Sequence, residues 1–140
     1  MHQARHRWRE IAQVAEAAVA LSVASLAIAI LPFRWIVRSM GSSTADNMRC
    51  AADVQAVRIA VRRASRRLPW RIVCFQEALA VHWMLRVRGN PSRLHYGLKQ
   101  ADGRLTAHVW VTLAGAAVIG EEAYEGHVCV AVFPTGRANG

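Results

Sequence analysis

The sequence predicts an α+β domain in which helices come first and an antiparallel sheet follows. Apolar residues recur at helical spacing in several segments before residue 90, and the period then changes to strict alternation in residues 93–99 and 105–113. Asp102-Gly103, between the two alternating runs, is typical of a two-residue hairpin turn. Helices followed by consecutive strands are the order of an α+β fold, and 140 residues suffice to bury a modest core.

Composition and charge narrow the class of partner without choosing one. The chain is 54% hydrophobic and 19% charged, which excludes a disordered segment. Its formal net charge is +9, nearly all of it from arginine, and such a charge suits an acidic peptide, a membrane surface or a nucleic acid. Three unevenly spaced cysteines without a CxxC pair indicate free thiols in a reducing, cytoplasmic environment.

The first expected element is a helix built on an apolar run. Ala17–Leu31 contains only two polar residues, Ser22 and Ser25, and the run ends at Pro32. Because a bilayer span needs about 20 apolar residues, a helix that is buried or docks on a partner is favoured over a membrane-associated helix. A cleaved signal peptide is disfavoured, since no small-x-small site follows the run. Residues 1–10 are basic and are expected to fray.

A polar break follows the apolar run and divides the chain. Gly41–Thr44 interrupts the hydrophobic pattern. Residues 1–45 are therefore expected to form a basic tail and an apolar helix, and residues 46–140 are expected to form the main domain.

The main domain is expected to begin with a helix that Thr44 or Asp46 can cap. Its apolar residues recur at spacings of three and four between Ala51 and Ala64, and Pro69 ends it. The arginines in Arg62–Arg67 fall in its last turns, where the helix dipole favours cations. They are interpreted as a solvated helix end, with a surface for an acidic peptide or lipid phosphate as the alternative.

The next helix is expected over residues 73–87, with Gly89 as the left-handed residue that ends it. Three apolar residues share the side of this helix that bears Cys74: Ala78, Val81 and Leu85. The thiol would therefore face inward at a groove. The N–H groups and positive dipole end at a helix start stabilise a thiolate, nearby Arg71 adds to this, and the Cys74 N–H could donate to an oxyanion. The alternative is a small buried apolar side chain.

Four strands are expected in the rest of the main domain, over residues 93–99, 105–113, 116–119 and 126–133. On the second of them His108 shares a face with Thr106, Trp110 and Thr112, and the other face is uniformly aliphatic. The aliphatic face is expected in the core, and the semi-polar face could meet the helix of Cys74. His108 is thus a candidate general base, with a hydrogen-bonded structural histidine as the alternative.

A carboxylate is expected beside His108. If Ala114-Gly115 is a two-residue hairpin loop, His108 pairs with Glu121, whereas a three-residue loop would bring Glu122 opposite. Either glutamate could fix the imidazole tautomer and stabilise its protonated form; the alternative is an exposed acidic loop. The order Cys74, His108 and Glu121 is that of a thiol enzyme with its nucleophile at a helix start and its base and acid on neighbouring strands.

Two other kinds of site receive less support from the sequence. His127 and Cys129 could join His108 around a zinc ion, but no second ligand pair has metal-binding spacing, so no bound metal or cofactor is expected. The five tryptophans are scattered over different segments, and no nucleic-acid motif or Gly-rich phosphate loop occurs. Nucleic acid is therefore not expected as a partner.

Three motifs resemble the B2 proteins, which are the leader peptidases of lasso-peptide biosynthesis. They are Arg66-Arg67-Leu68-Pro69-Trp70 followed by Cys74, the stretch Met84–Gly89, and Ala107-His108-Val109-Trp110-Val111. Leu31-Pro32-Phe33-Arg34 is similar to the end of that family's N-terminal helix, so the resemblance covers nearly the whole chain.

Membership of this family would imply a transglutaminase-like or papain-like core and a cysteine peptidase that removes the leader from a ribosomally made precursor. Cys74 would be the nucleophile and His108 the general base. The family's third residue is usually an aspartate soon after the histidine, where this chain has Glu121 and Glu122. The implied partners are the precursor peptide, a separate leader-recognition protein and an asparagine-synthetase-like macrolactam synthetase, which uses ATP.

A non-catalytic hypothesis is the alternative. A basic, membrane-peripheral interaction protein of a maturation complex would use the helix of Ala17–Leu31 to dock on lipid or on the synthetase. The two hypotheses differ in what they require of Cys74, which must be reactive in a peptidase and can be inert in a scaffold.

Overall fold

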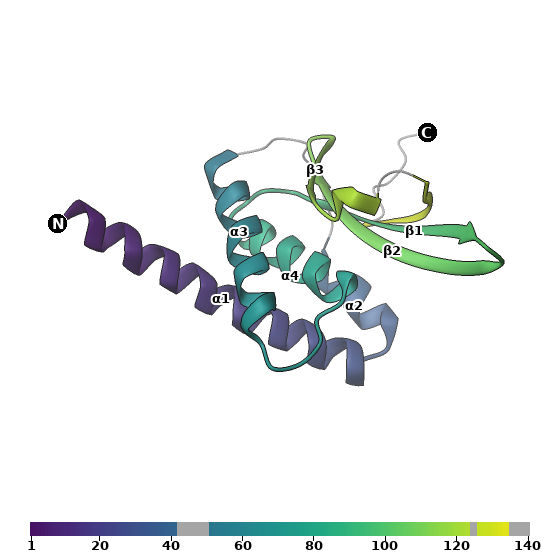
Figure 1. The fold of residues 1–140 in the computed structure, drawn as a ribbon, viewed down its shortest axis with the longest axis horizontal. Helices are drawn as coiled ribbons and strands as arrows, with labels where there is room; N and C mark the ends of the chain where they lie inside the picture. The colour runs from purple at the N-terminus through teal and green to yellow at the C-terminus, as the bar shows by residue number, and fades with distance from the viewer. Residues whose placement is uncertain (42–50, 124–125, 135–140) are drawn as a thin grey trace.

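The computed structural model describes residues 1–41, 51–123 and 126–134, and it confirms the predicted α+β fold class (Figure 1). Within this part of the chain the helices are α1 (His2–Ile30), α2 (Phe33–Ser39), α3 (Ala51–Arg67) and α4 (Cys74–Val87). The strands are β1 (Arg93–Ala101), β2 (Arg104–Leu113), β3 (Ala116–Ile119) and β4 (Val128–Phe133), with a short 3-10 helix, η1 (Glu121–Ala123), after β3. The strands form one antiparallel sheet in the order β3-β2-β1-β4.

α1 is longer than the apolar run that predicts it. The helix begins at His2, so the expectation that residues 1–10 fray is wrong; residues 2–10 are helical and exposed. Arginine, glutamine, alanine and glutamate dominate this segment and favour helix. Ala17, Leu21 and Ala24 are fully buried in one core with residues of α3 and α4. In Figure 1, α1 lies along α3 and α4, and α4 lies between α1 and the sheet.

Some predictions lie outside the described residues. The candidate caps Thr44 and Asp46 fall in residues 42–50, as does the expected division of the chain between residues 45 and 46. That division stays a prediction.

α4 is the central helix of the domain. Ala78, Val81 and Leu85 are buried in the core, as their spacing predicts. The helix ends as expected, because Gly89 has φ +73° and the Asn90 N–H donates to the carbonyl of Leu85 at 2.9 Å. The start and the end of α4 are therefore both encoded locally.

The turns of the sheet confirm two predictions. Asp102 and Gly103 have φ of +52° and +72° and connect β1 to β2. Ala114 and Gly115 have φ of +49° and +80°, and the flanking residues Leu113 and Ala116 are paired, which is the two-residue loop. The sheet meander therefore follows from residues that occupy the left-handed region.

The expected pairing of His108 with Glu121 is wrong. A β-bulge between Val111 and Thr112 shifts the register by one residue, so Val111 pairs with Ile119, and β3 then ends. Gly120 follows with φ +80°, and a Cβ there would lie 2.8 Å from the carbonyl oxygen of Val109. Only glycine allows this close approach, after which the chain leaves the sheet as η1.

The short length of β3 opens one side of β2. β3 pairs only with Val111–Leu113, so residues 108–110 have no partner strand on that side within the described part of the chain. The aliphatic residues Val109 and Val111 are in the core, as predicted. On the semi-polar face, Trp110 stacks on His95 of β1, with ring centroids 5.4 Å apart. His108 is the residue of this face that lines a pocket together with Cys74, so the expectation that the face meets the helix of Cys74 holds for His108 alone.

Candidate active site

Cys74 is the first residue of α4 and has a free, half-buried thiol. Val73 precedes the helix in an extended conformation, and its N–H donates to Gln76 Oε1 at 2.6 Å, which fixes the entry of the chain. The first N–H groups of any helix have no intrahelical acceptor and point out of its start. The Cys74 thiol therefore lies beside unused N–H donors and the positive end of the helix dipole.

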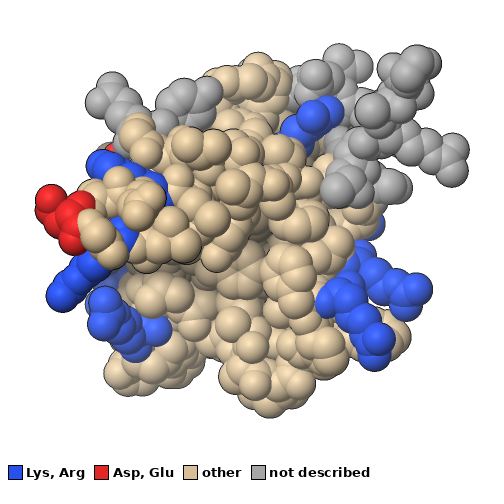
Figure 2. Space-filling model, turned by 90° about the vertical axis from the view of Figure 1, so that its right-hand side faces the viewer, with Lys and Arg blue, Asp and Glu red and all other residues tan. Residues whose placement is uncertain are grey.

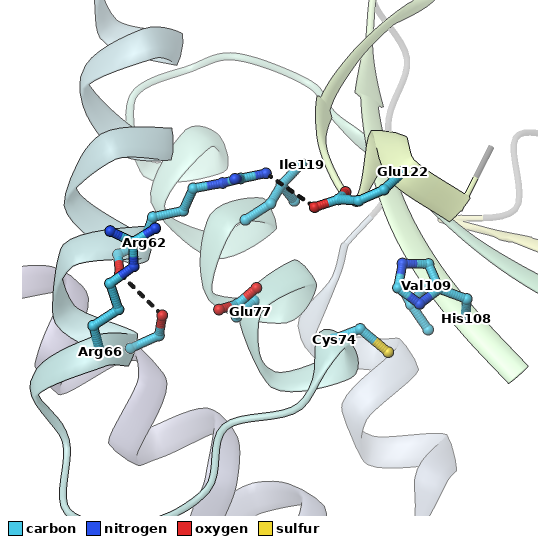
Figure 3. Close-up of a pocket in the computed structure, with 10 residues that line it drawn as sticks. Arg62, Arg66, Cys74, Glu77, His108, Val109, Ile119 and Glu122 are labelled. Atoms are coloured by element: carbon cyan, nitrogen blue, oxygen red, sulfur yellow. Dashed lines mark hydrogen bonds and ion pairs between the residues drawn. The ribbon is translucent and has the colours of Figure 1, made fainter.

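A pocket of about 230 Å³ contains both predicted reactive residues (Figure 3). Four segments line it: Arg62, Ser65 and Arg66 of α3, Cys74 and Glu77 of α4, His108 and Val109 of β2, and Ile119, Gly120 and Glu122 around the end of β3. Figure 3 shows the Cys74 thiol and the His108 imidazole on the same side of this pocket. The pocket occupies the side of β2 that β3 leaves uncovered.

His108 is half-buried, and its Nε2 atom is shielded from solvent without a hydrogen-bond partner among the described residues. Burial lowers the pKa of this imidazole below its usual 6.5, and the nearby charge of His127 lowers it further. Glu122 and Glu77 act in the opposite direction and raise that pKa. The net lowering keeps His108 neutral near pH 7, which is the form that can accept a proton.

The two candidate acids on η1 are in different places. The carboxylate of Glu121 forms an ion pair with Arg58 of α3, and Glu121 is not among the residues that line the pocket. Glu122 lines the pocket and lies 3.6 Å from Arg62. Of the two glutamates, Glu122 is thus the one that shares the pocket with His108.

Glu77 is a pocket residue that the sequence analysis did not identify. It lies one helical turn after Cys74 on α4, and its charge raises the pKa of His108. Residues at i and i+3 share a helix face, so the position of a glutamate three residues after the cysteine is a signal that the sequence does contain.

The α3 wall of the pocket is basic. Arg62 is paired with Glu122, whereas Arg66 is exposed and forms no ion pair with any described residue. Ser65 lies between them, and its hydroxyl donates to the carbonyl of Arg62 at 3.1 Å. The arginine run predicted as a solvated helix end therefore supplies one side of the cavity that contains Cys74 and His108.

The residues considered for zinc do not converge on one point. The rings of His108 and His127 are 5.8 Å apart, and Cys129 Sγ lies 3.7 Å from His95 Nδ1 instead. Within residues 1–41, 51–123 and 126–134, no group of three or more His, Cys, Asp or Glu side chains is arranged to hold a metal ion.

The protein is thus an α+β domain in which a cysteine at a helix start and a histidine on a strand line one pocket. The chain belongs to the transglutaminase-like superfamily, whose domain matches residues 4–131. This superfamily includes cysteine peptidases. No curated protein and no solved structure matches the chain significantly.

Proposed function

We propose that this protein is a cysteine peptidase in which Cys74 is the nucleophile and His108 the general base. The observation that supports this most directly is that both side chains line one pocket at the start of α4. The lowered pKa of His108 adds support, because a neutral imidazole can take the thiol proton.

The reaction proceeds in two steps. His108 accepts the Cys74 proton, the thiolate attacks the peptide carbonyl, and N–H groups at the start of α4 stabilise the oxyanion. The imidazolium then protonates the leaving amine as the C–N bond breaks, which leaves a thioester on Cys74. Water, deprotonated by His108, attacks the thioester; the C–S bond breaks, and the carboxylic product and the thiol are released.

We assign to Glu122 the role of the carboxylate that stabilises the protonated imidazole of His108. It lines the pocket, and its charge raises the pKa of His108, which means that it stabilises the protonated ring formed during the reaction. Glu77 acts in the same direction from α4. Glu121 does not line the pocket and forms its ion pair with Arg58 outside it, so it is the less suitable acid.

The substrate we propose is the leader segment of a lasso-peptide precursor. The resemblance to the B2 proteins at Arg66–Trp70, Met84–Gly89 and Ala107–Val111 supports this choice. A separate leader-recognition protein would present the precursor, and an asparagine-synthetase-like macrolactam synthetase, which uses ATP, would act on the released core. The guanidinium of Arg66 in the pocket wall, which forms no ion pair with the described residues, suits a carboxylate on the bound peptide.

The test is cleavage of the precursor peptide by the Cys74→Ala variant, followed by mass spectrometry with the partner proteins present. Cleavage should be abolished, and circular dichroism should show an intact fold. Cys129→Ala is the matched control, because Cys129 is exposed on β4 and should be dispensable. Retained leader removal by Cys74→Ala would refute the assignment.

The non-catalytic scaffold remains the second hypothesis, since one face of α1 is apolar and exposed. Thiol labelling across pH separates the two in a variant whose other cysteines, Cys50 and Cys129, are changed to alanine. A titration midpoint of Cys74 well below about 8.5 supports a peptidase, and an inert thiol supports a scaffold.

A further inference from the structure

A row of large apolar side chains lies on the solvent side of α1. Six of them are between 50% and 71% exposed, and we name them the α1 outer stripe: Trp8, Ile11, Val19, Val23, Leu26 and Ile30. At 100° per residue they fall on the side of the helix opposite Ala17, Leu21 and Ala24, which are fully buried. Soluble proteins rarely leave so many large apolar side chains exposed along one side of a helix without a partner.

The polar side chains within the apolar run do not prevent burial of the stripe. Ser22 donates to the carbonyl of Ala18 at 2.7 Å, and Ser25 donates to the carbonyl of Leu21 at 2.8 Å. Both hydroxyl protons are therefore satisfied by the helix itself, and an apolar environment would leave neither of them without an acceptor.

The charges around the stripe are positive. The acidic residues of α1, Glu10 and Glu16, are paired with Arg63 and Arg88 at 3.6 Å and 2.6 Å. Basic residues occur at both ends of the stripe: Arg5, Arg7 and Arg9 around its first residue, Trp8, and Arg34 and Arg38 after its last residue, Ile30. On the face seen in Figure 2, which is the end of the molecule where the β1–β2 hairpin projects, Lys and Arg side chains lie around a broad uncharged surface and acidic side chains are seen mainly at one edge.

The packing of α1 determines how it can meet a bilayer. By length and mean hydropathy, 1.8 over the most apolar window, the helix could cross a membrane. However, Ala17, Leu21 and Ala24 are buried against α3 and α4, and a spanning helix would have to leave this core. A helix that keeps its inner face in the domain can only lie along the surface, with its outer stripe in the lipid.

We propose that the α1 outer stripe docks this protein on the surface of an anionic bilayer, with α1 parallel to the membrane plane. The arginines at both ends would contact lipid phosphates while the stripe enters the acyl boundary. The ring centroid of Trp35 on α2 lies 5.2 Å from the guanidinium of Arg38. Tryptophan is enriched at membrane–water interfaces, where its ring lies at the level of the lipid headgroups.

A second copy of the chain is a poorer occupant of the same surface. An antiparallel stripe-to-stripe contact would place Arg5 and Arg9 of one copy near Arg34 and Arg38 of the other. A parallel contact would place each arginine cluster against itself. Like charges meet in both arrangements, whereas an anionic surface neutralises both clusters at once. The docking surface is also independent of the peptidase proposal, since the pocket lies on α3, α4 and the sheet.

Co-sedimentation with vesicles tests the proposal on the full chain. Binding should occur with vesicles that contain phosphatidylglycerol and should be weak with pure phosphatidylcholine. It should also fall as salt is added. Leu26→Glu should weaken partitioning by at least about tenfold, since a leucine no longer enters the lipid. Leu105→Glu is the matched control, because Leu105 is 68% exposed on β2, far along the chain from α1, and the change should leave binding intact.

Four outcomes would overturn the proposal, the last of them retention of the protein on the vesicles in an alkaline carbonate wash. One is equal binding to vesicles with and without phosphatidylglycerol. Another is an equal loss of vesicle binding in Leu26→Glu and Leu105→Glu. The third is a concentration-dependent dimer that Leu26→Glu dissociates without any vesicle binding, which would assign the stripe to a second copy. Release of bound protein by an alkaline carbonate wash supports a helix that lies on the surface, and retention would indicate a spanning helix instead.

Discussion

Two cysteine–histidine neighbours occur in the described part of the chain, and they differ in what surrounds them. On the outer face of the sheet, Cys129 Sγ lies 3.7 Å from His95 Nδ1, and His95 Nε2 is hydrogen-bonded to Thr112 Oγ1 at 2.7 Å. At the start of α4, Cys74 and His108 line a pocket. Cys129 and His95 thus have the better defined contact, whereas Cys74 and His108 have a pocket in which a substrate could bind.

Electrostatics separate the two pairs further. Burial lowers the pKa of both histidines, and the charge of Arg93 lowers that of His95 again. At His108 the carboxylates of Glu122 and Glu77 oppose the lowering and would stabilise an imidazolium. Acyl transfer needs more than a thiol beside an imidazole, because an oxyanion and an imidazolium must also be stabilised. Of the two pairs, Cys74 and His108 have both a helix start for the oxyanion and carboxylates for the imidazolium.

The largest expected effect distinguishes the two histidines. His108→Ala should lower the rate of leader cleavage by at least about 10³-fold, because the thiol loses its base and the leaving amine its acid. His95→Ala should leave the rate within about threefold of the parent, since His95 lies outside the pocket. Single-turnover cleavage at pH 7 measures both rates. A large loss in His95→Ala with little loss in His108→Ala would mean that the outer pair is the reactive one, and equal losses would contradict the assignment of His108 as the base.

A smaller effect is expected from the carboxylates. Glu122→Gln should slow cleavage by about 10- to 100-fold, because Glu77 still stabilises the imidazolium in part. Glu121→Gln should change the rate little and should instead loosen η1 from α3, since Glu121 is bound to Arg58. kcat and the thermal midpoint of the two variants provide the comparison. A larger loss of kcat in Glu121→Gln would restore Glu121 as the acid.

Much of the fold and part of the site could be predicted from the sequence because local chemistry determines them. Gly89 marks the end of α4, Asp102-Gly103 and Ala114-Gly115 mark two turns, and the position of Cys74 follows from the start of the apolar periodicity. The choice between Glu121 and Glu122 could not be made, because a β-bulge depends on how β3 packs and is invisible to simple alternation.

One signal for that shift was nevertheless present. Gly120 directly precedes the two glutamates, and its close approach to Val109 is what turns the chain out of the strand. The position of Glu77 was also readable from its spacing after Cys74. The exposed face of α1 could not be assigned from the sequence, since an apolar run does not show which of its sides packs against α3 and α4.

The smallest expected effect is a shift in the pH profile, and its sign tests the electrostatics of the pocket. Cleavage requires neutral His108, so kcat/KM should rise with pH through a midpoint below 6.5, the usual pKa of histidine. Glu122→Gln removes a charge that raises the pKa of His108, so the midpoint should move lower. His127→Gln removes a neighbour that lowers this pKa, so the midpoint should move higher. His95→Gln should shift it in neither direction. Because global destabilisation would not move the midpoint in opposite directions, paired shifts of opposite sign identify His108 as the titrating base, and shifts of the same sign would contradict that role.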